Sequence, residues 1–138
     1  MISSPIKRRS PTGDLGSHRT EILSPINMDI LLDVTEGDSE GLRQLADLYL
    51  KHIREALGQL AAAIQGRRSK SLEALAHGCA GSSASFGAVL VSALFRELEV
   101  MGRQGQFADA ASKLEQSKRE FGRVVSYLEE MFSQTKVA

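Results

Sequence analysis

The chain has 138 residues, 42% of them hydrophobic and 5% aromatic, and its 17 basic and 17 acidic residues balance. This length predicts one folded domain with its own core, and the balanced charge gives no sign of a nucleic-acid or membrane partner. The single cysteine excludes an intramolecular disulfide and fits a cytoplasmic protein, and no stretch approaches the ~20 apolar residues of a membrane span.

Residues 1–24 form a separate region in composition. They contain two of the three prolines, two glycines, five serines and the basic run from Lys7 to Arg9, without an apolar period. We therefore predict a disordered N-terminal tail over residues 1–24 and a folded domain over residues 25–138.

The pattern becomes helical after the tail. A short apolar segment from Ile26 to Val34 predicts a capping helix that stops at Gly37. Asp38 is the expected N-cap of a long second helix that ends at Gly66. Its apolar stripe advances in steps of three and four residues and consists of Leu42, Leu45, Ala46, Tyr49, Ile53, Ala56, Leu60 and Ile64.

Three further helices are predicted. The third is expected to be capped by Ser69 and to run to about Phe86, with Gly87 allowing a tight turn. The fourth has its expected inward stripe at Leu90, Leu94, Leu98 and Met101 and closes in the loop from Gly102 to Gly105. The fifth has Phe107, Ala111, Leu114, Phe121, Val125, Leu128 and Phe132 inward. Short loops between long helices predict an all-α, up-down antiparallel four-helix bundle with the short N-terminal helix as a cap.

His77 lies in the most informative segment of the sequence. An α-helix turns about 100° per residue, so Lys70, Glu73, Ala80, Gly81 and Ala84 share its face. Three of these five neighbours are alanine or glycine. The opposite, inward face is expected to consist of Leu72, Leu75, Ala76, Cys79, Ser83 and Phe86. The spacing therefore predicts an exposed imidazole that another protein can reach. Cys79 is expected to be an inert buried thiol, and no metal site is predicted.

The run His-x-x-x-Gly-Ser-Ser-x-x-hydrophobic-Gly-Ala, from His77 to Ala88, resembles the motif of histidine-containing phosphotransfer (HPt) domains. The pair Leu98-Glu99 resembles the next helix of that family. The resemblance implies that His77 accepts a phosphoryl group, that the protein relays it between receiver-domain aspartates, and that Mg²⁺ belongs to the partner receiver domain. The partner is thus the receiver domain of a response regulator or hybrid histidine kinase, and we expect a monomer that needs no cofactor of its own.

The proposed partner-binding residues are Gly81 and Ala84, which provide clearance, together with Ala80, Ser82 and Lys70. HPt domains usually carry a lysine three residues after the histidine, where this chain has Ala80. A lysine at position 80 is therefore expected to prolong the lifetime of the phosphohistidine, since Glu73 on the same face adds repulsion. The sequence has no glycine-rich phosphate loop, which argues for a phosphocarrier and against an ATP-dependent enzyme.

Two alternatives remain open. One is a non-catalytic helical adaptor that binds a receiver domain, which the absence of the lysine favours and the presence of His77 disfavours. The other is a histidine-kinase dimerisation domain. That family usually places an acidic residue directly after the histidine, where this chain has Gly78, so we disfavour it.

Overall fold

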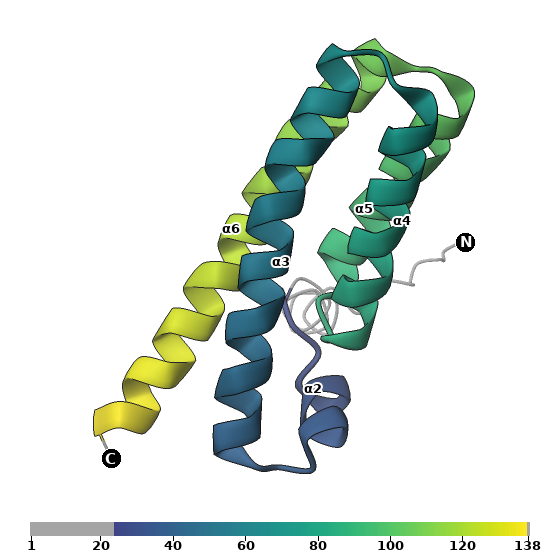
Figure 1. Cartoon of the computed structure of the whole chain (residues 1–138). Helices are drawn as coiled ribbons and strands as arrows, with labels where there is room; N and C mark the ends of the chain where they lie inside the picture. Colours follow the sequence, from purple (N-terminus) through teal and green to yellow (C-terminus); the bar gives the residue numbers. More distant parts are fainter. Residues whose placement is uncertain (1–23, 138) are drawn as a thin grey trace, which may run out of the picture.

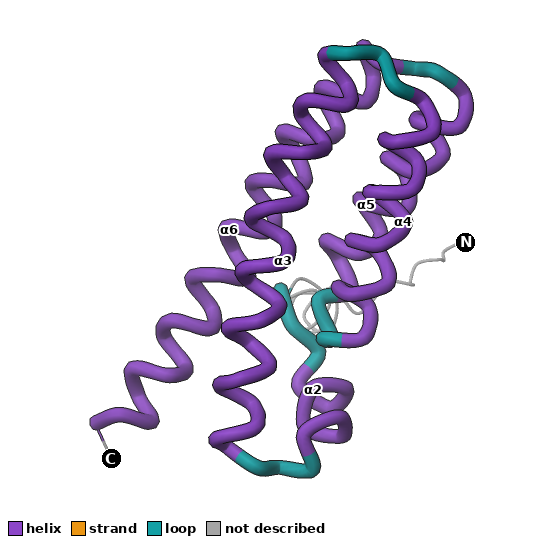
Figure 2. The backbone as a smooth tube through the Cα atoms, viewed as in Figure 1, coloured by secondary structure: helices purple, strands orange, loops and turns teal. Residues whose placement is uncertain are grey.

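The computed structural model describes residues 24–137, so the predicted N-terminal tail lies almost entirely outside the described residues. Within residues 24–137 every regular element is a helix and there is no strand (Figure 2). The helices are α2 (Met28–Thr35), α3 (Ser39–Gln65), α4 (Ser69–Ser85), α5 (Val89–Gln104) and α6 (Phe107–Val137). No helix in this part of the chain is long and apolar enough to cross a membrane.

Four of these helices form the predicted up-down bundle. Each of α3, α4 and α5 packs against the next helix in the chain, and α6 returns to α3 and closes the ring. The most extensive contact joins α4 to α5. Because α3 and α6 are longer than α4 and α5, they extend past one end of the α4–α5 hairpin, and α2 lies at this end (Figure 1). The short N-terminal helix is thus a cap, as predicted.

The ends of α3 follow its sequence. The Asp38 side chain accepts a hydrogen bond from the Gly41 backbone N–H at 3.0 Å, which satisfies a donor that the first turn cannot pair internally. Gly66 ends the helix. The buried stripe contains Leu42, Ala46, Tyr49, Ile53, Ala56, Leu60 and Ala63, so both predicted ends and most of the predicted stripe are confirmed.

The start of α4 differs from the prediction. Ser69 is the first helical residue and not the N-cap, a position that Arg68 holds without a side-chain capping bond. The Ser69 hydroxyl instead donates to the Gly102 carbonyl oxygen on α5 at 2.6 Å. A tertiary contact has replaced the expected local cap, and it ties the beginning of α4 to the end of α5.

The turn between α4 and α5 is as tight as predicted. Gly87 has φ +87, a conformation that side chains rarely adopt. Its carbonyl oxygen accepts from the Asn27 backbone N–H at 2.7 Å, and a Cβ on Gly87 would lie 2.7 Å from the Asn27 carbonyl oxygen. The Asn27 side chain in turn caps α2 by accepting from the Asp29 N–H at 3.0 Å. The turn therefore positions α2 on the bundle.

The inward faces of α5 and α6 are shifted by one residue from the predicted ones at several positions. Leu90 and Leu94 are half-buried, and the buried residues of α5 are Val91, Ser92, Phe95, Leu98 and Gly102. In α6, Ala111 is exposed and Val125 half-buried, whereas their neighbours Ala110 and Val124 are buried. The helical period predicts the inward face only to within one residue. Which of two adjacent residues is buried depends on the helices packed on either side.

Candidate functional site

His77 projects outward from the middle of α4, and 72% of its side chain is exposed. Two glycines flank it, Gly78 next in the chain and Gly81 one turn later. A Cβ added to either glycine would meet no atom within 4 Å, so the approach to the imidazole is open on this side. The predicted exposure of His77 is confirmed.

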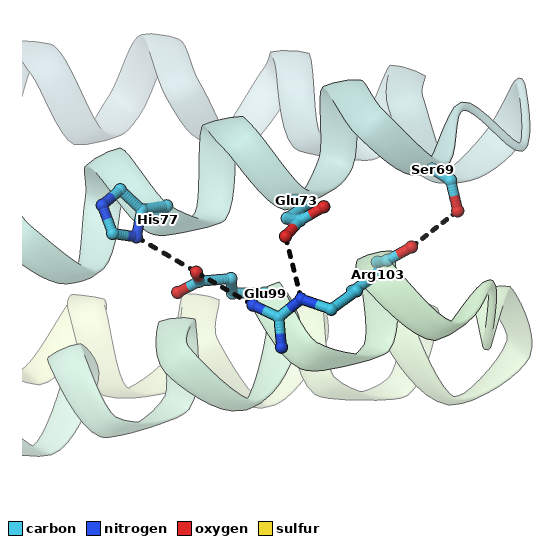
Figure 3. Close-up of polar contacts among 6 residues, drawn as sticks. Ser69, Glu73, His77, Glu99 and Arg103 are labelled. Atoms are coloured by element: carbon cyan, nitrogen blue, oxygen red, sulfur yellow. Dashed lines mark hydrogen bonds and ion pairs between the residues drawn. The ribbon is translucent and has the colours of Figure 1, made fainter.

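The imidazole is held from one side by α5. Its Nδ1 lies 3.1 Å from Oε2 of Glu99 (Figure 3). A carboxylate can only accept a hydrogen bond, so this contact favours the tautomer with the proton on Nδ1 and leaves the lone pair on Nε2. The Glu99 side chain is only 16% exposed, which holds the acceptor in place between α4 and α5.

Arg103 lies one turn after Glu99 and binds two carboxylates. Its Nε donates to Glu73 Oε2 on α4 at 2.9 Å, and its Nη2 to Glu99 Oε2 on α5 at 3.3 Å (Figure 3). The hydrogen bond and the charge of Glu73, followed by the charge of Glu99, raise the pKa of Arg103. Glu73 is therefore paired with a cation, which the sequence analysis did not anticipate when it assigned repulsion to this residue.

The small residues near His77 do not all lie on the surface. Gly81 is exposed and Ala84 half-buried, as expected for residues that give clearance. The expectation that Ala80 is exposed is wrong, because Ala80 is 0% exposed. It packs against α5, and its carbonyl oxygen accepts from the Ser92 hydroxyl at 2.8 Å. Ala80 therefore cannot contact a partner directly.

The two serines of the motif have different surroundings. The Ser82 hydroxyl donates to the Gly78 carbonyl oxygen at 2.9 Å, within its own helix. Ser83 is buried, and its hydroxyl lies 2.8 Å from that of Tyr49 on α3. Tyr49 also stacks on Phe86, with ring centroids 4.4 Å apart. Ser82 thus remains available at the surface, whereas Ser83 belongs to the core.

A shallow hollow of about 460 Å³ lies beside the imidazole. It is lined by Lys70, Glu73, Ala74, His77 and Glu99. Lys70 is exposed and lines this hollow, and its contact with a partner stays a prediction. The hollow thus contains one cation and two carboxylates next to the imidazole.

An apolar groove lies on the other side of α4. It has a volume of about 320 Å³ and is lined by Val34, Leu45, Leu48, Tyr49, His52, Ser82, Ser85 and Phe86. Leu48 is 66% exposed and Val34 53%, so two large apolar side chains of the groove face solvent. His52 also lines a neighbouring hollow that reaches Gly78, so the groove continues toward His77.

Comparison with known proteins agrees with this geometry. The profile of the Hpt domain family matches residues 44–137, which include α4, α5 and all but the first residues of α3. The chain belongs to the Hpt domain family. A crystal structure of histidine-containing phosphotransfer protein B (HptB) from Pseudomonas aeruginosa PAO1 is similar to it, with 29% identity and a TM-score of 0.70. The match covers 78% of this chain and 95% of that one. No match was found among curated proteins.

Membership of the Hpt family identifies histidine phosphotransfer in a two-component phosphorelay as the function. Hpt domains interact with receiver domains of response regulators or kinases, which defines the class of partner. The all-helical fold predicted from the sequence is likewise confirmed.

The two α5 residues of this Hpt site were not predicted from the sequence. Glu99 was noted only as part of the family pattern, and Arg103 was not noted at all. They lie 22 and 26 positions after His77, and only the antiparallel register of α4 and α5 brings them to it. A search of the predicted fourth helix for charged residues on the side facing the third would have found both.

Other candidate chemistry has little support at this site. Among the described residues there is no cluster of histidine, cysteine and acidic side chains suited to a metal ion. Burial raises the pKa of the Cys79 thiol from 9.0 to about 12, so the nucleophilic thiolate is disfavoured. The remaining histidine besides His52 and His77 is His18, which lies outside the described residues.

Proposed function

We propose that His77 is the residue that accepts the phosphoryl group, and that this Hpt protein carries it between receiver-domain aspartates. The observation that carries the proposal is the contact between His77 Nδ1 and Glu99 Oε2 at 3.1 Å on a side chain that is 72% exposed. It holds the ring from one side and leaves Nε2 directed toward an incoming partner.

The chemistry follows from this arrangement. The Nε2 lone pair attacks the phosphorus of an aspartyl phosphate in line with the leaving carboxylate. A P–N bond forms, the P–O bond to the aspartate breaks, and the aspartate leaves as a carboxylate. The ring gains positive charge during this step, and Glu99 stabilises it through the proton on Nδ1. Transfer to the next aspartate is the reverse reaction.

The chain contributes a nucleophile and its orientation, and the partner contributes the rest. Phosphoryl transfer depends mainly on positioning and on neutralisation of charge. We place Mg²⁺ on the partner receiver domain and regard this protein as a phosphocarrier without a cofactor of its own. A monomer in the cytoplasm fits this role, because a second copy on α4 would cover the imidazole.

The docking surface for the receiver domain consists of the open approach around His77 and the apolar groove between α3 and α4. Gly81, Ala84 and Ser82 lie between the two, and Lys70 extends the surface along α4. Leu48 supplies the largest exposed apolar side chain of the groove. Apolar contacts of this kind give affinity, while His77 supplies the chemistry.

The proposal is tested with His77→Gln. The purified wild type and variant are incubated with a phosphorylated receiver domain, and acid-labile label on each is measured. We expect the variant to fold normally and to take no label, because the side chain lies outside the core. His18→Gln is the control and should be labelled like the wild type, because His18 has no part in the proposed site. Label on His77→Gln comparable to that of the wild type would refute the assignment.

A non-catalytic adaptor is the second candidate, since no cation occupies position 80. It predicts that the wild type binds the receiver domain and takes no label. Titration of binding alongside the labelling experiment separates the two functions.

A further inference from the structure

Two carboxylates line the hollow beside the imidazole. Glu99 reaches His77 from α5, whereas Glu73 lies four residues before it on α4 and lines the same hollow. A glutamate placed four residues before a basic side chain is the arrangement in which helical side-chain pairs form most readily. In isolation, α4 would therefore favour a contact between Glu73 and His77.

The structure shows a different pairing. Glu73 Oε2 accepts from Arg103 Nε at 2.9 Å, and His77 Nδ1 lies 3.1 Å from Glu99 Oε2. The same Glu99 oxygen accepts from Arg103 Nη2 at 3.3 Å. The planar guanidinium has donors in a fixed fork. Arg103 can therefore bind Glu73 and Glu99 at the same time and hold both carboxylates in place.

We propose that Arg103 is a positioning residue that assigns Glu99 to His77 by withdrawing Glu73 from competition. The proposal rests on the phosphotransfer function of His77 proposed above. Arg103 acts through the two carboxylates and need not touch the phosphoryl group. Without it, Glu73 draws the ring toward α4, and the fraction of molecules with Nε2 in the productive orientation falls.

Arg103 also balances the charge of the site. Lys70 and Arg103 are the cations around the hollow, and Glu73 and Glu99 are the anions. Loss of Arg103 leaves an excess negative charge where the dianionic phosphoryl group is placed. Loss of Arg103 is therefore expected to slow transfer both through the orientation of the ring and through the charge of the site. The experiment has to separate these two effects.

Three variants separate these effects. Arg103→Gln removes both the charge and the fork, Arg103→Lys keeps the charge alone, and the double variant Arg103→Gln with Glu73→Gln also removes the competitor. The tautomer and ring environment of His77 are measured by nitrogen-15 NMR, and the transfer rate from a phosphorylated receiver domain is measured in parallel. Arg123→Gln is the matched control, since Arg123 pairs with Glu120 on α6.

We expect Arg103→Gln to reduce the Nδ1–H tautomer and to slow transfer about three- to tenfold. Arg103→Lys should restore less than half of the loss, because a lysine cannot bind both carboxylates in the fork geometry. The double variant should regain the wild-type tautomer. Arg123→Gln should change neither quantity.

An unchanged tautomer in Arg103→Gln overturns the proposal, and so does a double variant that does not regain it. The NMR measurement needs no phosphate. A wild-type protein that accepts no phosphate therefore refutes the proposed function, while the tautomer of Arg103→Gln still decides the role of Arg103.

Discussion

Gly102 of α5 lies against the backbone of Glu73 on α4, because glycine has no side chain of its own to hold the two helices apart. A Cβ on Gly102 would lie 2.9 Å from the Glu73 backbone nitrogen and 2.9 Å from Leu72 Cγ. The Ser69 hydroxyl bonds the Gly102 carbonyl oxygen at the same place. This close approach brings Glu99 and Arg103 within reach of His77 and Glu73.

Gly102→Ala should therefore destabilise the protein although alanine favours helix. Overpacking at a closed contact costs about 1–3 kcal/mol, which exceeds the gain of up to ~1 kcal/mol in helix propensity. Urea unfolding measures the difference. Gly122→Ala is the control, because a Cβ there meets nothing within 4 Å, and it should raise stability. Equal effects of the two substitutions would show that α4 and α5 are not in such close contact.

Gly81→Glu should separate stability from transfer. Position 81 is exposed and a Cβ meets nothing there, so stability should hold or rise by up to ~1 kcal/mol. The glutamate side chain obstructs the approach to His77, so we expect transfer to slow at least about tenfold. This corresponds to an activation barrier that is ~1.4 kcal/mol higher. Quenched time courses of phosphoryl transfer from a phosphorylated receiver domain measure the rate. Gly122→Glu on α6 should leave it unchanged, and a wild-type rate in Gly81→Glu contradicts the docking surface.

The burial of Ala80 changes what a lysine at this position is expected to do. Ala80→Lys inserts a long chain where α4 packs against α5, and we now expect a loss of about 1–3 kcal/mol of stability instead of a simple gain in phosphohistidine lifetime. Ala74→Lys is the better test of charge, because Ala74 is exposed and lines the hollow beside His77. It should prolong the phosphohistidine lifetime by up to about fivefold, equivalent to ~1 kcal/mol. An unchanged lifetime in Ala74→Lys removes the electrostatic explanation.

Stability should fall at alkaline pH because two buried groups must stay protonated. Burial raises the pKa of Cys79 from 9.0 to about 12, and burial also raises that of Tyr49. An unfolded thiol loses its proton before the folded one, so the contribution of Cys79 is complete below pH ~9 and declines by ~1.4 kcal/mol per pH unit as the pH rises toward 12. The contribution of Tyr49 begins to decline only above the pKa of ~10 of an unfolded tyrosine.

Urea unfolding of the wild type and Cys79→Ala between pH 7 and 10.5 measures this decline. The variant should be less stable at pH 7, because a buried side chain is shortened, but its stability should fall less steeply between pH 9 and 10. Parallel curves for the two proteins would exclude Cys79 as a source of the decline.

Features that depend on neighbours along the chain could be predicted from the sequence. Asp38 caps the start of α3 through a local hydrogen bond and Gly66 is the C-cap at its end, and Gly87 makes the turn because its positive φ suits glycine. The exposure of His77 also follows from local pattern, since the helical period opposes it to the apolar face. The Gly-Ser-Ser and Gly-Ala residues that follow His77 indicated the Hpt family.

The residues that surround His77 depend on how the helices pack, which the sequence pattern did not predict. Ala80 and Gly81 lie about 60° and 40° from it around the helix, on opposite sides, so periodicity places both near the same face. The packing of α5 buries Ala80 and leaves Gly81 exposed. The register of α5 against α4 likewise places Glu99 and Arg103 beside His77 and Glu73. It also places the Gly102 carbonyl oxygen where the Ser69 hydroxyl binds it, instead of capping its own helix. Register depends on how side chains of two helices interlock, which the period of either helix alone does not specify.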